Sequence, residues 1–104
     1  MSDELVVFVL GTTVYVYLTT TTLAGEAKTP TGSVKVQIKY KDGTEKVAIT
    51  DMTEDATGEH SYYADTDGWT SGATAWYIVT TTSVDGSGDS AKTNICRSGF
   101  YLIP

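Results

Sequence analysis

The stretch from Ser33 to Lys41 reads S-V-K-V-Q-I-K-Y-K. Apolar or aromatic side chains occupy every second position from Val34 to Tyr40, and lysine or glutamine occupies the positions between them. A period of two sends alternate side chains to opposite faces of a strand, so one face packs on a buried layer while the other meets water. The segment therefore predicts an antiparallel strand that covers a core on one side.

Comparable strand-forming runs recur along the chain, separated by turn signals such as Asp42-Gly43 and Asp85-Gly86. The predicted strands cover residues 5–10, 12–22, 33–41, 45–50, 59–64, 73–84 and 92–103. About seven short strands at this spacing favour one all-β domain over residues 1–104, an antiparallel sandwich with Greek-key connections. A small closed barrel is the alternative. Residues 51–58 are predicted to be a polar connection.

Composition and charge narrow the range of partners. The chain has 104 residues, of which 40% are hydrophobic and 19% charged, which fits one globular domain. A net charge of −6 argues against nucleic acid and anionic membranes as partners, because both need clustered lysine and arginine. The start is acidic, and the apolar run Leu5–Leu10 is shorter than a membrane span or a typical secretory core. We therefore expect the chain to be made and kept in the cytoplasm.

Short motifs follow one another in the second half of the chain: M-T at 52–53, G-E-H-S-Y-Y at 58–63, Y-I-V at 77–79, V-D-G at 84–86 and F-Y-L at 100–102. In this order they resemble bacterial immunoglobulin-like repeats, and the resemblance extends over residues 32–103. It implies an immunoglobulin-like sandwich. The chain departs from the repeats at His60, where an aromatic residue is usual, and near Trp76, where the glycine that ordinarily precedes the tyrosine is missing.

Reactive residues are scarce. His60 is the only histidine and Cys96 the only cysteine, which argues against a histidine-based metal site and excludes an intrachain disulfide. We therefore predict no enzymatic activity, no cofactor and no metal, and we expect His60 to point into the core. Aspartates gather in three loops, where they are expected to cap their own turns; a structural Ca²⁺ is the alternative.

Two features predict contacts. The first is a run that is apolar on both faces and therefore needs cover on both: Leu5, Val6, Val7, Phe8, Val9 and Leu10. We expect this run to lie in a subunit contact, with one alternate set of its side chains covered by a partner. The second is Trp69 in a Gly- and Thr-rich loop, either a cap folded back near Met52 and Tyr63 or an exposed anchor for protein or sugar. Trp76 is expected to plug the space between the sheets.

These features lead to two hypotheses. Single-domain immunoglobulin-like chains of this size resemble small accessory head or neck proteins of tailed viruses. The first hypothesis is accordingly a non-enzymatic virion protein, a head, neck or decoration subunit that contacts its own copies or a larger capsid or tail protein. It would be assembled in the host cytoplasm. The alternative is a carbohydrate- or cell-surface-binding module that uses Trp69 and belongs to a larger surface assembly.

Overall fold

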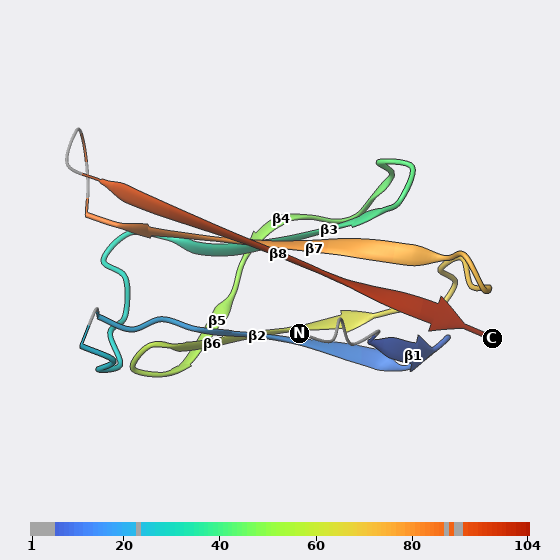
Figure 1. The fold of residues 1–104 in the computed structure, drawn as a ribbon, viewed down its shortest axis with the longest axis horizontal. Helices are drawn as coiled ribbons and strands as arrows, with labels where there is room; N and C mark the ends of the chain where they lie inside the picture. The colour runs from blue at the N-terminus through green and yellow to red at the C-terminus, as the bar shows by residue number, and fades with distance from the viewer. Residues whose placement is uncertain (1–5, 23, 87, 89–90) are drawn as a thin grey trace.

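The structure is a computed structural model that describes residues 6–22, 24–86, 88 and 91–104. Its strands form two sheets that lie over each other as two layers (Figure 1). The strands are β1 (Val7–Val9), β2 (Thr13–Thr19), β3 (Val34–Tyr40), β4 (Glu45–Asp51), β5 (Thr53–Ala56), β6 (Glu59–Asp65), β7 (Trp76–Asp85) and β8 (Lys92–Ile103). The five-stranded sheet has the order β1-β8-β7-β3-β4, and the three-stranded sheet has the order β2-β6-β5. The predicted all-β class is confirmed. The described segments contain no helix that could cross a membrane.

Strand β3 has the alternation that its sequence predicts, whereas in β4 the register with β3 shifts at two points and Ile49 is 64% exposed. Val34, Val36 and Ile38 are buried, while the side chains between them lie at the surface. At the turn, Gly43 has a φ of +94°, a conformation that residues with a Cβ rarely adopt, and its N–H donates to the Tyr40 carbonyl at 2.8 Å. The turn therefore requires the glycine of the Asp-Gly pair.

The core lies between the two sheets and has an aromatic centre. Tyr77 is fully buried, and its ring stacks on Phe100 at 5.2 Å between centroids and lies 5.0 Å from Tyr40. The prediction for Trp76 is wrong, because that side chain is 37% exposed on the outer face of β7. Adjacent residues of a strand point to opposite faces, so burial of Tyr77 turns Trp76 outward.

One side of the sandwich is sealed by the chain itself. The chain runs from β4 in one layer directly into β5 in the other (Figure 1), and Met52 at the crossing is only 8% exposed. The sequence reading missed β5, because its T-E-D-A sequence has no apolar alternation and all four residues are exposed. The structure thus has eight strands where about seven were predicted.

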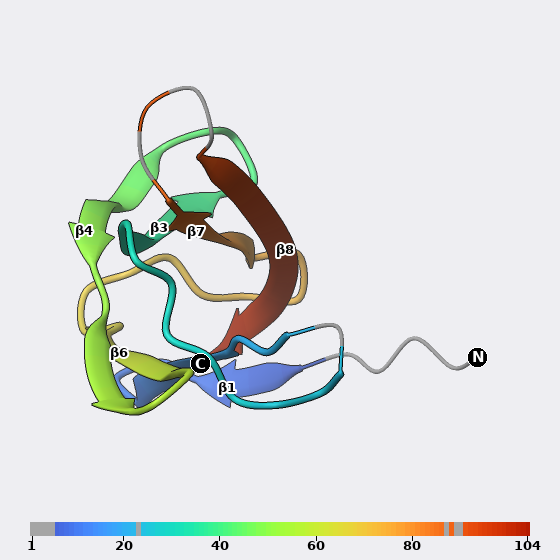
Figure 2. The same ribbon diagram turned by 90° about the vertical axis from the view of Figure 1, so that its left-hand side faces the viewer.

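On the opposite side lie β1 and β2, each of which pairs with a strand on one side only within the part of the chain that the structure describes. Figure 2 shows β8 curving from the layer of β3 and β7 down toward the layer of β1 and β6. The end of β8 pairs with β1 in parallel, Val7 opposite Tyr101 and Val9 opposite Ile103, whereas the other ladders are antiparallel. The Greek-key connection stays a prediction.

Candidate functional site

The first candidate surface is the edge strand β1. Phe8 and Leu10 pack against the core, and the Phe8 ring meets Phe100 edge-to-face at 5.6 Å. Val7 and Val9 point away and are 48% and 51% exposed. The run that was apolar on both faces is therefore divided between core and surface. Leu5 lies outside the described residues.

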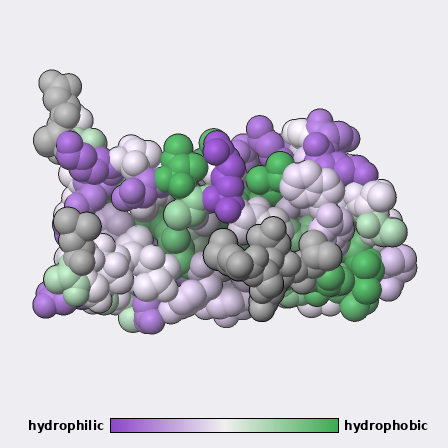
Figure 3. Space-filling view, in the orientation of Figure 1, coloured by the Kyte–Doolittle hydropathy of each residue, from purple (hydrophilic) through white to green (hydrophobic). Residues whose placement is uncertain are grey.

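The exposed residues of β1 join others at the end of β8. We define the β1 patch as Val7, Val9 and Ile103, which share one face of the parallel pair of β1 and β8. Backbone bonds hold the patch in place, with the Tyr101 N–H donating to the Val6 carbonyl at 2.8 Å and the Leu10 N–H donating to the Ile103 carbonyl at 2.7 Å. Figure 3 shows hydrophobic side chains gathered at the right-hand end of the molecule, where β1 and the end of β8 lie. A patch of this kind on a free edge suits contact with another protein.

Trp69 lies at one end of the sandwich, in the loop between β6 and β7. Its half-buried ring is 5.1 Å from the Tyr77 ring and packs against the core. The loop is held by the Tyr77 hydroxyl, which donates to the Thr70 carbonyl at 2.6 Å. This placement corresponds to the capping alternative for Trp69.

A cluster of exposed tyrosines, which the sequence reading did not identify as a group, lies on the outer face of the three-stranded sheet. Tyr15 is 4.8 Å from Tyr63 and 5.7 Å from Tyr17, measured between ring centroids. The Tyr17 hydroxyl donates to Glu59 Oε1 at 2.7 Å, and this bond is the main reason why the pKa of Tyr17 is raised. Alternation within β2 predicts that Tyr15 and Tyr17 share a face, but only the pairing of β2 with β6 adds Tyr63.

A groove runs between β2 and the strands β1 and β8. Its apolar part has a volume of about 290 Å³ and is lined by Val6, Phe8, Val14, Tyr15, Val16, Tyr17, Val79, Ser98, Gly99 and Phe100. A polar hollow of about 450 Å³ lies between the end of β2 and β7–β8, lined by threonines, Lys28, Asp85 and Lys92 among others. The side of the sandwich opposite Met52 is therefore open along β2.

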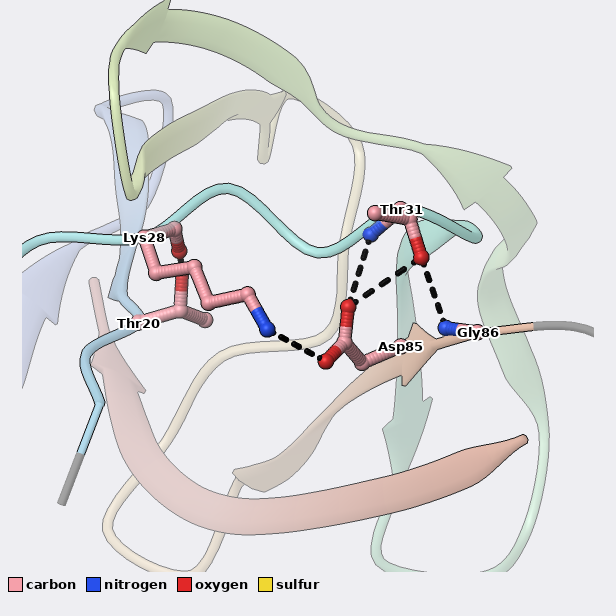
Figure 4. Close-up of polar contacts among 5 residues, drawn as sticks. All are labelled: Thr20, Lys28, Thr31, Asp85 and Gly86. Carbon is pink, nitrogen blue, oxygen red and sulfur yellow. Dashed lines mark hydrogen bonds and ion pairs between the residues drawn. The ribbon is translucent and has the colours of Figure 1, made fainter. Parts of the chain in front are cut away.

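Asp85 ties the loop before β3 to the end of β7 (Figure 4). One carboxylate oxygen accepts a bond from the Lys28 ammonium at 2.8 Å, and the other accepts the Thr31 N–H at 3.0 Å. The Thr31 hydroxyl in turn accepts the Gly86 N–H at 2.7 Å. The bond from Lys28, followed by that from the Thr31 backbone, lowers the pKa of Asp85 to about 2. The arrangement fastens a loop.

Groups with reactive chemistry are scattered. His60 points inward, as expected, and is 4% exposed, and its Nδ1 has no hydrogen-bond partner among the described residues. Cys96 is exposed on β8. Asp65 Oδ1 accepts the Asp67 N–H at 3.0 Å, the bond of an aspartate that caps its own turn. Within the described ranges, no three metal-ligating side chains come together.

No family model, curated protein or solved structure matches the chain. Its function must therefore be inferred from its surfaces.

Proposed function

We propose that the chain is a non-enzymatic structural subunit that acts through contacts with other proteins. The observation that carries this proposal is the β1 patch, where Val7 and Val9 remain about half exposed on the free edge of a sheet. Burying such side chains in an interface is favourable, since each removes apolar surface from water. Among the described residues β1 pairs with β8 alone, so its other edge adds backbone donors and acceptors that a partner can pair.

We further propose that the assembly is a virion and that the chain is a head, neck or decoration subunit. The resemblance of residues 32–103 to immunoglobulin-like repeats and the size of the domain support this class. The partner is then another copy or a larger capsid or tail protein. The genes that neighbour this one provide a direct check, because capsid and portal genes beside it would support the class and their absence would count against it.

Sedimentation velocity tests the β1 patch. We expect Val7→Lys combined with Val9→Lys to sediment as a lighter species than wild type at the same concentration. Ile49→Lys is the matched control, because Ile49 is 64% exposed on β4, away from the patch. Circular dichroism should show that all three proteins are folded. Identical sedimentation of wild type and the double variant would contradict self-association through the patch.

The tyrosine cluster favours a second candidate function, binding of a carbohydrate. Tyr15, Tyr17 and Tyr63 offer neighbouring ring faces on a rigid sheet, and aromatic side chains can bury large apolar areas against a ligand. A glycan array with wild type and Tyr63→Ala tests this alternative. Saccharide binding that Tyr63→Ala abolishes would support the binding module, and an array without any binding would count against it.

A further inference from the structure

The strand β2 has a free edge without the usual protection. It pairs with β6 on one side and has no strand on the other within the described residues. All seven of its residues are in register with β6, from Thr13 opposite Asp65 to Thr19 opposite Glu59, without a bulge. Its sequence, T-V-Y-V-Y-L-T, contains neither charge nor proline. Proteins normally protect edge strands with charges, prolines, bulges or very short strands, so this edge is suited to pairing.

The sequence of β2 is nearly the same in both directions. Read backward it is T-L-Y-V-Y-V-T, which differs only by the exchange of valine and leucine. An antiparallel pair with a two-fold axis at Val16 would therefore place Thr13 opposite Thr19, Val14 opposite Leu18 and Tyr15 opposite Tyr17 of the second chain. Each residue then faces one of similar chemistry, so the two-fold contact is self-complementary along the whole strand.

We propose that β2 pairs with β2 of a second copy of this chain, so that two three-stranded sheets become one continuous sheet. The nearly palindromic sequence of β2 favours this occupant. The chain carries a net charge of −6, so two copies repel each other in general, but no charge of either copy lies on the paired strands. The pairing would also cover Tyr15 and Tyr17, which are 44% and 47% exposed.

The groove beside β2 adds apolar surface to this contact. Val14 and Val16 line it from β2, while Phe8 and Phe100 line it from β1 and β8. A second β2 in the proposed register brings its own inward-facing valines to this opening. A seven-residue strand pair and its neighbours form a smaller contact than the roughly 800 Å² per partner of a standard interface. We therefore expect a reversible dimer whose population depends on concentration.

Two double variants test the register by analytical ultracentrifugation. Tyr15→Lys with Tyr17→Lys places two like charges opposite each other at both symmetry-related sites, and should raise the dimer Kd by about a hundredfold or more. Tyr15→Glu with Tyr17→Lys loses the same two rings, but places opposite charges at both sites. Because opposite charges attract, this variant should dimerise more tightly than the first, by about tenfold or more. Melting temperatures should establish that both variants fold.

The outcomes separate this inference from the proposed function. Val7→Lys with Val9→Lys removes the β1 patch but should leave the β2 dimer intact, because neither Val7 nor Val9 lines the groove beside β2. A wild type that stays monomeric up to millimolar concentration would overturn the inference. So would equal affinity of the two β2 variants, because it would show that residues 15 and 17 do not face each other.

Discussion

The two edges of the three-stranded sheet differ in length, charge and regularity, three features that control pairing. The β5 edge is four residues long, carries Glu54 and Asp55, and its register with β6 shifts before Ala56. The β2 edge is seven residues long, uncharged and in unbroken register. Charge, irregularity and shortness protect an edge from pairing, whereas a long regular edge invites it. The same sheet thus presents one protected edge and one that is suited to a partner.

The two sides of the sandwich also differ in how well the chain covers its own core. On the side of β5, the chain crosses between the layers at Met52 and seals the core with its own side chain. On the side of β2, the groove reaches inward to Phe8 and Phe100. Intrachain packing therefore closes one side, and we expect subunit contact to close the other.

The largest expected effect comes from the sealed side. Met52→Ala removes a buried side chain at the crossing and should lower the free energy of unfolding by about 2–5 kcal/mol. Tyr15→Ala removes a half-exposed ring from the open side and should cost below about 1 kcal/mol in the dilute monomer. Urea denaturation at low protein concentration measures both values. Equal losses would contradict the difference between the two sides.

Trp69 covers the core at the end of the sandwich, as Met52 does at its side. Its ring is half-buried against Tyr77, so Trp69→Ala should cost about 1.5–2.5 kcal/mol, half of the roughly 3–5 kcal/mol for a fully buried tryptophan. Trp76→Ala is the matched control, because Trp76 lies on an outer face and should cost below about 1 kcal/mol. A loss below about 1 kcal/mol for Trp69→Ala in the same denaturation experiment would reject the capping role.

A smaller effect is expected at Asp85, which fastens the loop beside the polar hollow. Its pKa is lowered from 3.8 to about 2, first by the bond from Lys28, so the ionised carboxylate stabilises the folded state at neutral pH. This contribution is fully present above about pH 4 to 5 and disappears as the pH falls through the folded-state pKa. Asp85→Asn should therefore melt at a lower temperature than wild type at pH 7. The difference between the two melting temperatures should shrink on acidification, and a difference that stays constant down to about pH 2 would contradict this role.

Removal of metal ions and reduction of thiols are both expected to leave the stability of the fold unchanged. Neither EDTA nor a reductant should shift the melting temperature, because the aspartates serve turns and Cys96 has no second cysteine in the chain. A drop of several degrees with EDTA would show that a bound cation stabilises the native state. Such a drop would revive the Ca²⁺ alternative for the acidic loops.

Periodicity made much of the fold predictable. The alternation from Ser33 to Lys41, the Asp42-Gly43 turn and the bounds of β8 are all read from local signals. The acidic strand β5 was missed because its T-E-D-A sequence is typical of a turn. It becomes a strand because the chain crosses between the layers at Met52 and then pairs with β6. Tertiary context determined its conformation.

The site was less predictable, because it depends on which strands are neighbours. Sequence alone identified the apolar run around Val7 but could not decide which of its faces is buried. That choice follows from the parallel pairing of β1 with the end of β8. The free edge of β2 was likewise hidden, since Tyr15 and Tyr17 look like ordinary strand residues until β6 is known to be their only strand neighbour in the described chain.

Disulfide trapping tests the β2 pairing most directly. Thr13 and Thr19 face each other across the proposed two-fold axis, and directly opposed residues of antiparallel strands have Cα atoms about 4.5–5.5 Å apart, within the range that a disulfide spans. In a Cys96→Ser background, Thr13→Cys with Thr19→Cys should give a covalent dimer on mild oxidation, whereas either cysteine alone should give little. Failure of the double variant to form a covalent dimer, or equal dimer yields from the single variants, would contradict the pairing.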